Sequence, residues 1–144
     1  MLPTSVPLLI LPFALYNIVA LFMPEFSWNN EIWRVHMISG GEWAITAGDA
    51  IVAASVLILM IDLLRSARHS GRRTILDHVL SMVLFVGMLI EFLTVKAVVS
   101  STFFLLLVVS FVDVAAGFSV SIRAAIARRD VLLDEAGGGG GAGA

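Results

Sequence analysis

The chain has 144 residues, of which 59% are hydrophobic and 14% are charged, with a formal net charge of −2 and no cysteine. Soluble domains are about 45–50% apolar and about 25% charged, and a chain of this size cannot bury so many apolar side chains in its own core. Lipid must cover the remainder, so a membrane protein is predicted. The lack of cysteine excludes disulfides, iron–sulfur clusters, thiolate zinc sites and thiol catalysis.

Four apolar runs follow one another along the chain, at about residues 7–23, 44–64, 76–99 and 102–122. Each is close to the ~20 residues that a helix needs to cross the hydrocarbon layer. They predict an all-α integral membrane four-helix bundle, which forms a single domain over residues 1–130. The first run lacks preceding basic residues and a following cleavage pattern of small residues, so we expect a retained span rather than a signal peptide.

The segment between the first two runs is too polar to span a membrane and too long for a turn. It contains the three tryptophans of the chain, Trp28, Trp33 and Trp43. Ile32, Val35 and Ile38 recur at helical spacing, and two glycines follow them as a stop signal. This pattern predicts a short interfacial helix, with the indole rings of the three tryptophans at the level of the lipid headgroups.

Basic residues gather at one end of the predicted bundle. Seven of the nine lie between the second and third runs or after the fourth: Arg65, Arg68, Arg72, Arg73, Arg123, Arg128 and Arg129. This bias places both termini in the cytoplasm, with the first four of these arginines at the lipid headgroups. Residues 131–144 are rich in glycine and predict a flexible cytoplasmic tail.

Four polar residues, Asn17, Asp49, Glu91 and Asp113, fall inside the predicted spans. Counted from the outer surface at 1.5 Å per residue, they lie between about 9 and 18 Å deep, all in the outer half of the bilayer. We expect Glu91 to face the bundle interior near Asp113. The cluster has two interpretations, a proton or cation site and a set of helix-joining hydrogen bonds of ~0.6 kcal/mol each.

Small residues surround Asp113 on the fourth predicted helix. Ser110, Gly117 and Ser121 share one stripe with it, at spacings that allow a neighbouring helix to approach closely. We therefore expect helix packing there.

The three histidines, His36, His69 and His78, do not form a pair at matching depth inside the bundle. We therefore expect neither a metal nor any other cofactor, although imidazole is the commonest metal ligand.

Three stretches, "SGGEWAITAGD", "DLLRSAR" and "FVDVAAGFSVSIRAA" followed by "RRD", resemble those of short four-span proteins of the bacterial inner membrane. The resemblance covers roughly residues 38–130 and rests mostly on topology and packing signals. It implies a multi-pass protein of the bacterial inner (cytoplasmic) membrane, and it implies no mechanism.

Two functions remain open at this point. The first is a non-enzymatic accessory or scaffold subunit, which packs against a larger membrane complex or against copies of itself. The alternative is a small proton- or cation-coupled transporter or channel that uses Asp49, Glu91 and Asp113. We favour the first, because the chain has few inward polar groups for a continuous pathway. The sequence contains no recognisable catalytic motif, so no enzyme is expected, and the partners are membrane lipids and protein subunits rather than nucleic acid.

Overall fold

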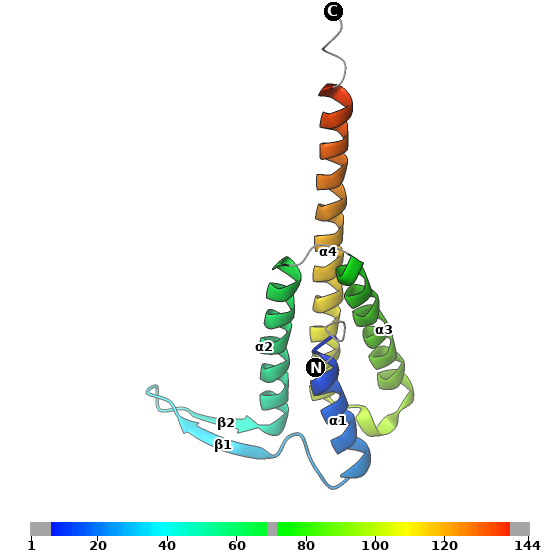
Figure 1. Ribbon diagram of the computed structural model, residues 1–144. Coiled ribbons are helices and arrows are strands. Elements are labelled where there is room, and N and C mark those ends of the chain that lie inside the picture. The colour runs from blue at the N-terminus through cyan, green and yellow to red at the C-terminus, as the bar shows by residue number, and fades with distance from the viewer. Residues whose placement is uncertain (1–6, 69–71, 139–144) are drawn as a thin grey trace, which may run out of the picture.

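The computed structural model describes residues 7–68 and 72–138, and most of them are helical (Figure 1). The elements in chain order are α1 (Ile10–Phe22), β1 (Glu31–His36), β2 (Glu42–Thr46), α2 (Ala47–Arg68), α3 (Arg72–Thr94), the 3₁₀-helix η1 (Lys96–Val98) and α4 (Ser101–Gly138). The prediction of a mainly helical membrane protein is confirmed in this coarse form. The all-α assignment is wrong, because a β-hairpin stands between α1 and α2.

Within the described residues, three helices are long and apolar enough to cross a membrane. Their candidate spans are Ala47–Arg65, Leu76–Thr94 and Ser101–Gly137. Helix α1 has 13 residues, which is ~20 Å at 1.5 Å per residue and shorter than the ~30 Å of a hydrocarbon layer. The structure therefore supports three of the four predicted spans and gives a shorter apolar helix for the first.

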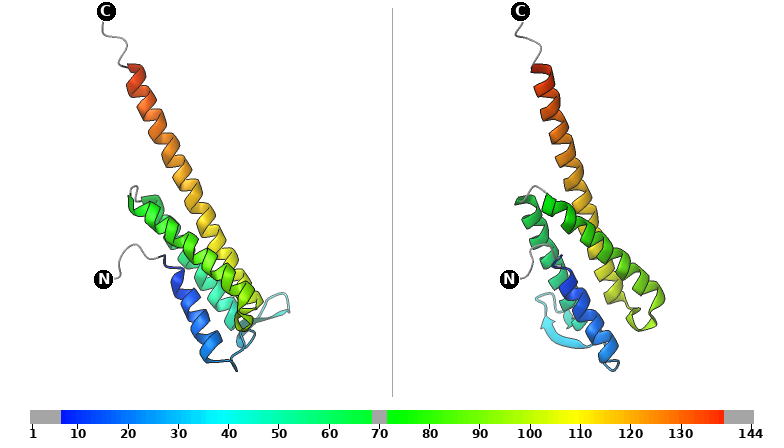
Figure 2. Two further views of the ribbon diagram at one scale, coloured as in Figure 1. Left: turned by 90° about the vertical axis from the view of Figure 1, so that its right-hand side faces the viewer. Right: turned by 45° about the vertical axis from the view of Figure 1, so that its right-hand side comes forward.

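Helix α4 is the centre of the arrangement, with α2 and α3 packed against it. Figures 1 and 2 show α1 beside the lower part of these helices and α4 continuing far beyond their upper ends. Two ends can be distinguished. We call the end with β1, β2 and the α3–α4 connection the hairpin end. The opposite end, with the C-terminus of α2 and the N-terminus of α3, is the arginine end.

The predicted interfacial helix around Ile32, Val35 and Ile38 is wrong, because these residues belong to strand β1 and to the hairpin loop that follows it. Strands β1 and β2 pair in antiparallel fashion, with His36 opposite Glu42. The Gly40 N–H donates to the Met37 carbonyl at 2.9 Å, and the Met37 N–H donates to the Gly41 carbonyl at 2.8 Å. Gly40 has a φ of 85°, which favours glycine and is typical of a hairpin loop that ends in a bulge. The two glycines are therefore a turn signal rather than a helix stop.

Helix boundaries differ from the prediction around the fourth helix. Helix α3 ends at Thr94 instead of residue 99, and η1 fills part of the connection. The hydroxyl of Ser100 then accepts a hydrogen bond from the Phe103 N–H at 3.0 Å, which caps the start of α4. Helix α4 continues to Gly138, since residues 123–136 contain no proline and are mostly good helix formers such as alanine, arginine and leucine. The tail predicted from residue 131 is therefore helical as far as Gly138, and residues 139–144 lie outside the described residues.

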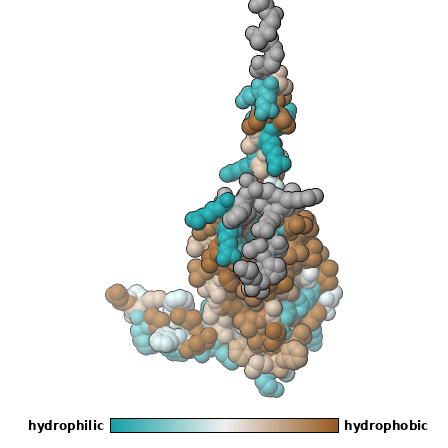
Figure 3. Space-filling model, viewed as in Figure 1, coloured by the Kyte–Doolittle hydropathy of each residue, from teal (hydrophilic) through white to brown (hydrophobic). Residues whose placement is uncertain are grey.

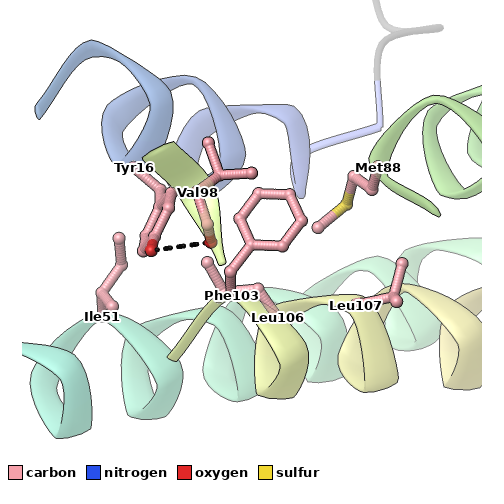
Figure 4. Packing of buried hydrophobic residues seen from close by; sticks show 7 residues of the cluster. All are labelled: Tyr16, Ile51, Met88, Val98, Phe103, Leu106 and Leu107. Carbon is pink, nitrogen blue, oxygen red and sulfur yellow. Dashed lines mark hydrogen bonds between the residues drawn. The ribbon is translucent and has the colours of Figure 1, made fainter. Parts of the chain in front are cut away.

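The main core lies near the hairpin end, where α1, η1 and the start of α4 meet. Its buried residues are Tyr16, Ile51, Met88, Val98, Phe103, Leu106 and Leu107 (Figure 4). Figure 3 shows a largely hydrophobic bundle surface, with hydrophilic side chains on the projecting part of α4, on the hairpin and at the two ends of the bundle. This distribution is typical of a bundle whose outer surface faces lipid.

Candidate functional site

The four polar residues that were predicted to lie together inside the membrane occupy three different places in the structure. Asn17 and Glu91 are partners: the Asn17 amide donates to a Glu91 carboxylate oxygen at 3.3 Å and to the Phe13 carbonyl at 3.2 Å. Asp49 and Asp113 lie elsewhere. The four residues therefore do not form one cluster, and the hydrogen bond between Asn17 of α1 and Glu91 of α3 is the contact found among them.

Tyr16 completes a polar group with its neighbour Asn17. Its hydroxyl lies 2.5 Å from Ser100 Oγ and donates to the Val98 carbonyl at 3.3 Å. The ring is only 1% exposed and stacks on Trp28 with 4.6 Å between ring centroids. We call Tyr16, Asn17, Glu91 and Ser100 the hairpin-end cluster. It ties α1 to α3 and to the residue that caps α4.

Asp49 is exposed and belongs to the first turn of α2. Its carboxylate accepts hydrogen bonds from the Thr46 N–H at 2.9 Å and from the Thr46 hydroxyl at 2.7 Å. A carboxylate at this position also interacts favourably with the positive end of the helix dipole. Asp49 therefore stabilises the junction between β2 and α2 and does not face the bundle interior.

Asp113 lies far from Glu91, so the predicted pairing of these two acids is wrong. Its carboxylate accepts a hydrogen bond from Ser81, which precedes Glu91 by ten residues in α3, or ~15 Å along the helix. The depth estimate failed because α3 ends at Thr94, only three residues after Glu91. Glu91 is therefore shallow, whereas Asp113 lies twelve residues into α4.

A second polar group joins α2, α3 and α4 nearer the arginine end. We call Asp62, Asp77, His78, Ser81 and Asp113 the arginine-end cluster. Asp62 accepts a hydrogen bond from the Leu8 N–H at 3.1 Å and interacts electrostatically with Asp113, Arg65 and Asp77. His78 lies within electrostatic range of Asp113. Three acids and one imidazole thus share a partly buried place where three helices meet.

His78 occupies the space that a glycine leaves on α4. Its imidazole lies directly against Gly117, where an added Cβ would collide with the ring. The ring also meets Phe118 edge-on, with 4.6 Å between centroids. Its Nε2 is buried without a hydrogen-bond partner among the described residues. Gly117 therefore permits the close packing of a histidine from α3.

The other two residues of the predicted packing stripe have different surroundings. Ser110 is buried and lines a cavity of ≈ 10 Å³ with Ser55 of α2, and its hydroxyl has no hydrogen-bond partner within the described part of the chain. Ser121 is half-buried, one turn beyond Gly117. Burial along this stripe therefore decreases from Ser110 toward Ser121.

The residues predicted to contact lipid headgroups differ in how exposed their side chains are. Trp28 is half-buried against Tyr16, whereas Trp33 and Trp43 of the hairpin are 68% and 50% exposed. Arg65 and Arg68 are exposed at the end of α2. Arg72 and Arg73 belong to the first turn of α3, and their side chains, like the whole of His69, lie outside the described residues.

Sequence reasoning missed Tyr16, Asp62, Asp77 and the packing of His78. Asp62 comes three residues before Arg65, and Asp77 comes four residues after Arg73. Counting depth from the arginine end as well as from the outer end would have placed both acids at a similar level. No comparable signal points to Tyr16, because its role depends on the path of the α3–α4 connection.

The hydroxyl of Tyr16 is expected to contribute to stability through its two contacts. Tyr16→Phe keeps the ring stacked on Trp28 and removes one buried hydrogen-bonding group, at a cost of about 1 kcal/mol. Thermal unfolding in detergent measures the effect. Thr94→Val is the matched control, because it removes a hydroxyl that is exposed and bonded only to its own helix at the Ile90 carbonyl. Equal effects of the two variants would contradict the role given to Tyr16.

Glu91 is expected to act as a hydrogen-bond acceptor for Asn17. Glu91→Gln retains an acceptor of the same shape and should leave stability unchanged, whereas Glu91→Leu removes it and costs ~0.6 kcal/mol. Steric trapping in bilayers measures the free energy of unfolding of both variants. Destabilisation by Glu91→Gln equal to that by Glu91→Leu would show that the negative charge, and not the hydrogen bond, is required.

The two clusters are separated by the apolar core. Met88, Phe103, Leu106 and Leu107 lie between them and are all buried. No group of three or more histidine, aspartate or glutamate side chains among residues 7–68 and 72–138 is arranged to hold a metal ion. Comparison of the chain with protein-family models, with characterised proteins and with solved structures found no match.

Proposed function

We propose that the chain is a non-enzymatic accessory or scaffold subunit of a membrane complex, with α4 as its binding element. The observation that carries this proposal is the length of α4. It has 38 residues, or ~57 Å at 1.5 Å per residue, against ~30 Å of hydrocarbon. From Arg123 to Gly137 every side chain is exposed. About the last two-fifths of α4 therefore extends beyond both the bundle and the bilayer.

A helical extension that packs against nothing in the described part of its own chain would be stabilised by packing against a partner. Isolated helices shorter than ~12–15 residues are marginal in water, and most helices in proteins are stabilised by packing of an apolar face. Exposed residues recur along α4 at alternating spacings of four and three: Phe111, Ala115, Phe118, Ile122, Ala125, Arg129 and Leu132. We call this the α4 seam. Six of these seven residues are apolar, with Arg129 as the exception, and an apolar seven-residue repeat is typical of helices that pack lengthwise on another helix.

The alternative, a proton- or cation-coupled transporter or channel, has less support. It requires polar groups that follow one another from face to face. The hairpin-end cluster and the arginine-end cluster are instead separated mainly by buried apolar side chains, including Phe103 and Met88. Ser55 and Ser110 are polar side chains in this layer, around a cavity of only ≈ 10 Å³. The polar groups hold helices together, as expected for a scaffold.

We also propose that the arginine end faces the cytoplasm of a bacterial inner membrane, with both termini on that side. Arg65, Arg68 and the projecting part of α4 all lie at this end (Figure 1), and positive charge favours the cytoplasmic side. The Leu8 N–H, just before α1, also donates a hydrogen bond to Asp62 near the same end.

This topology predicts the labelling of two single cysteines, which the cysteine-free chain makes simple to introduce. Ser39→Cys in the hairpin loop should react with an impermeant thiol reagent in intact cells. Glu135→Cys in α4 should react only after the cells are permeabilised. The opposite pattern would reverse the orientation, and reaction of both residues in intact cells would place the two ends on one side.

The scaffold proposal is tested by extracting the full chain from its native membrane in mild detergent and measuring the protein mass of the particle by light scattering. We expect a mass larger than one chain, from a partner subunit or from a second copy. Leu132→Glu in the α4 seam should reduce that mass. Val131→Glu, which is equally exposed but points away from the seam, is the matched control and should not.

Two results would contradict the proposal. One is a wild-type particle with the mass of a single chain in every mild detergent tried. The other is a proton or cation flux in vesicles that contain only this purified protein and that disappears with Asp113→Asn, which would favour the transporter.

A further inference from the structure

The β-hairpin has two chemically different faces. Trp33 pairs with Ile45, and Val35 pairs with Trp43. Side chains of directly opposed residues lie on the same face of a sheet, and successive residues alternate between faces. These four residues therefore form one apolar face, which we call the tryptophan face.

Charged side chains occupy the other face. Arg34 lies opposite Ala44, and His36 lies opposite Glu42. The Arg34 guanidinium donates to both Glu31 oxygens, at 2.8 and 2.7 Å, and to Glu42 at 2.9 Å. His36 Nε2 lies 2.9 Å from the second Glu42 oxygen. These residues are exposed, and hydrogen bonds from Arg34 lower the pKa of the Glu31 carboxyl. This charged network belongs in water.

The hairpin leaves the bundle at the level where the membrane span begins. Strand β2 ends at Thr46, and the candidate span of α2 begins at the next residue, Ala47. Figures 1 and 2 show the hairpin extending sideways from the foot of the helices. A bilayer around the helices would therefore have its surface along the hairpin.

The apolar surface of the hairpin is continuous with the apolar surface of the helices. Ile32 is the extra residue at a bulge in β1, next to Trp33. Together with Trp28 it lines an open groove of ≈ 420 Å³, whose other lining residues come from α1 and α2 and include Leu15, Ala54 and Ile58. Lipid that covers these helices would meet the tryptophan face without an intervening charge.

We propose that the hairpin is a membrane-surface anchor whose tryptophan face rests on a lipid bilayer while the charged network stays in water. Indole rings favour the headgroup level, because one part of the ring is apolar and its N–H can hydrogen-bond. Arg34 is already bound by two glutamates, so the anchor recognises the apolar–polar boundary of the lipid and not its charge. This inference concerns the end of the molecule opposite the α4 extension and is independent of the scaffold proposal.

Collision measurements on nitroxide labels test the anchor in the full-length protein reconstituted into phosphatidylcholine vesicles. Trp43 and Ala44 are neighbours in β2 that belong to opposite faces. A label at Trp43→Cys should collide mainly with oxygen, which concentrates in lipid. A label at Ala44→Cys, the matched control, should collide mainly with a water-soluble nickel chelate. Adding phosphatidylglycerol should not change either result.

A second measurement leaves the hairpin intact. Tryptophan fluorescence of the wild-type protein should be quenched by lipids brominated near the headgroup, and the Trp33→Phe/Trp43→Phe variant should lose most of that quenching.

Three outcomes would overturn the proposal. Equal access of the nickel chelate to residues 43 and 44 would place both faces in water. Low access of both reagents to residue 43 would show that a second copy of the chain covers the tryptophan face. A requirement for phosphatidylglycerol would show recognition of anionic lipid.

Discussion

Gly117→Ala is expected to destabilise the protein by about 1–3 kcal/mol, the range for an added methyl group in a well-packed site. The Cβ would collide with the imidazole of His78, and several of its ring atoms are close enough to be displaced. Moving His78 also disturbs the arginine-end cluster, since the imidazole lies within electrostatic range of Asp113. Unfolding in detergent at matched protein concentration measures the loss.

Gly87→Ala is the control for this variant, because Gly87 lies within the candidate membrane span of α3 and nothing stands within 4 Å of an added Cβ. Alanine is the better helix former by about 0.5–1 kcal/mol, so Gly87→Ala should leave stability unchanged or raise it. The double variant Gly117→Ala/His78→Ala should be more stable than Gly117→Ala alone. If His78→Ala does not relieve the loss, the close contact is not its cause.

Phe103→Ala should have the largest effect of any single truncation. The ring is 0% exposed and meets three other rings, with centroid distances of 5.1 Å to Tyr16, 5.9 Å to Phe92 and 6.2 Å to Phe13. Truncation leaves a cavity beneath α1. In lipid the transfer part of the usual loss is absent, because hydrocarbon is as apolar as the core, so we expect about 2–4 kcal/mol, mainly from lost packing.

Phe104→Ala provides the comparison, since Phe104 is the next residue and is 50% exposed on the lipid-facing surface. Its loss should be below about 1 kcal/mol, because lipid can fill the space that an exposed ring vacates. Unfolding in the same detergent measures both variants. Similar losses for the two phenylalanines would mean that the centre of packing lies elsewhere.

Much of the fold follows from the sequence because apolar run length is a simple physical signal. The runs around α2, α3 and the first part of α4 match the thickness of a bilayer, and they become helices of spanning length. The hairpin was mistaken for a helix because Ile32, Val35 and Ile38 satisfy a three-residue spacing by coincidence. The alternation of Trp33 and Val35 with Arg34 and His36, before two glycines, is the stronger signal and predicts a strand.

The candidate site was less predictable than the fold because depth depends on where helices end. Counting residues from the turn at Ser100 and Ser101 predicts similar depths for Glu91 and Asp113. About half of the residues between Glu91 and Ser100 are not in α3, however, because η1 and the extended residues beside it form the connection. Rotation about the helix axis is a further unknown. The rotation of α1 that brings Asn17 to Glu91 also brings Tyr16 to Ser100, and the sequence does not encode this rotation in a readable pattern.

Because α4 is continuous, the direction in which its residues face inside the bundle determines the direction in which its residues face beyond the bundle. The helix is capped by Ser100 at one end, holds Asp113 inside the bundle, and carries Leu132 outside it, all on one uninterrupted hydrogen-bonded rod. Each residue of a helix turns its successor by ~100°, at 3.6 residues per turn. One residue inserted after Ser121 would therefore swing the outer part of the α4 seam by ~100° while leaving the bundle as it is, and four inserted residues would nearly restore the phase. Because α2 and α3 pack against the first part of α4, they also set the direction in which Leu132 faces.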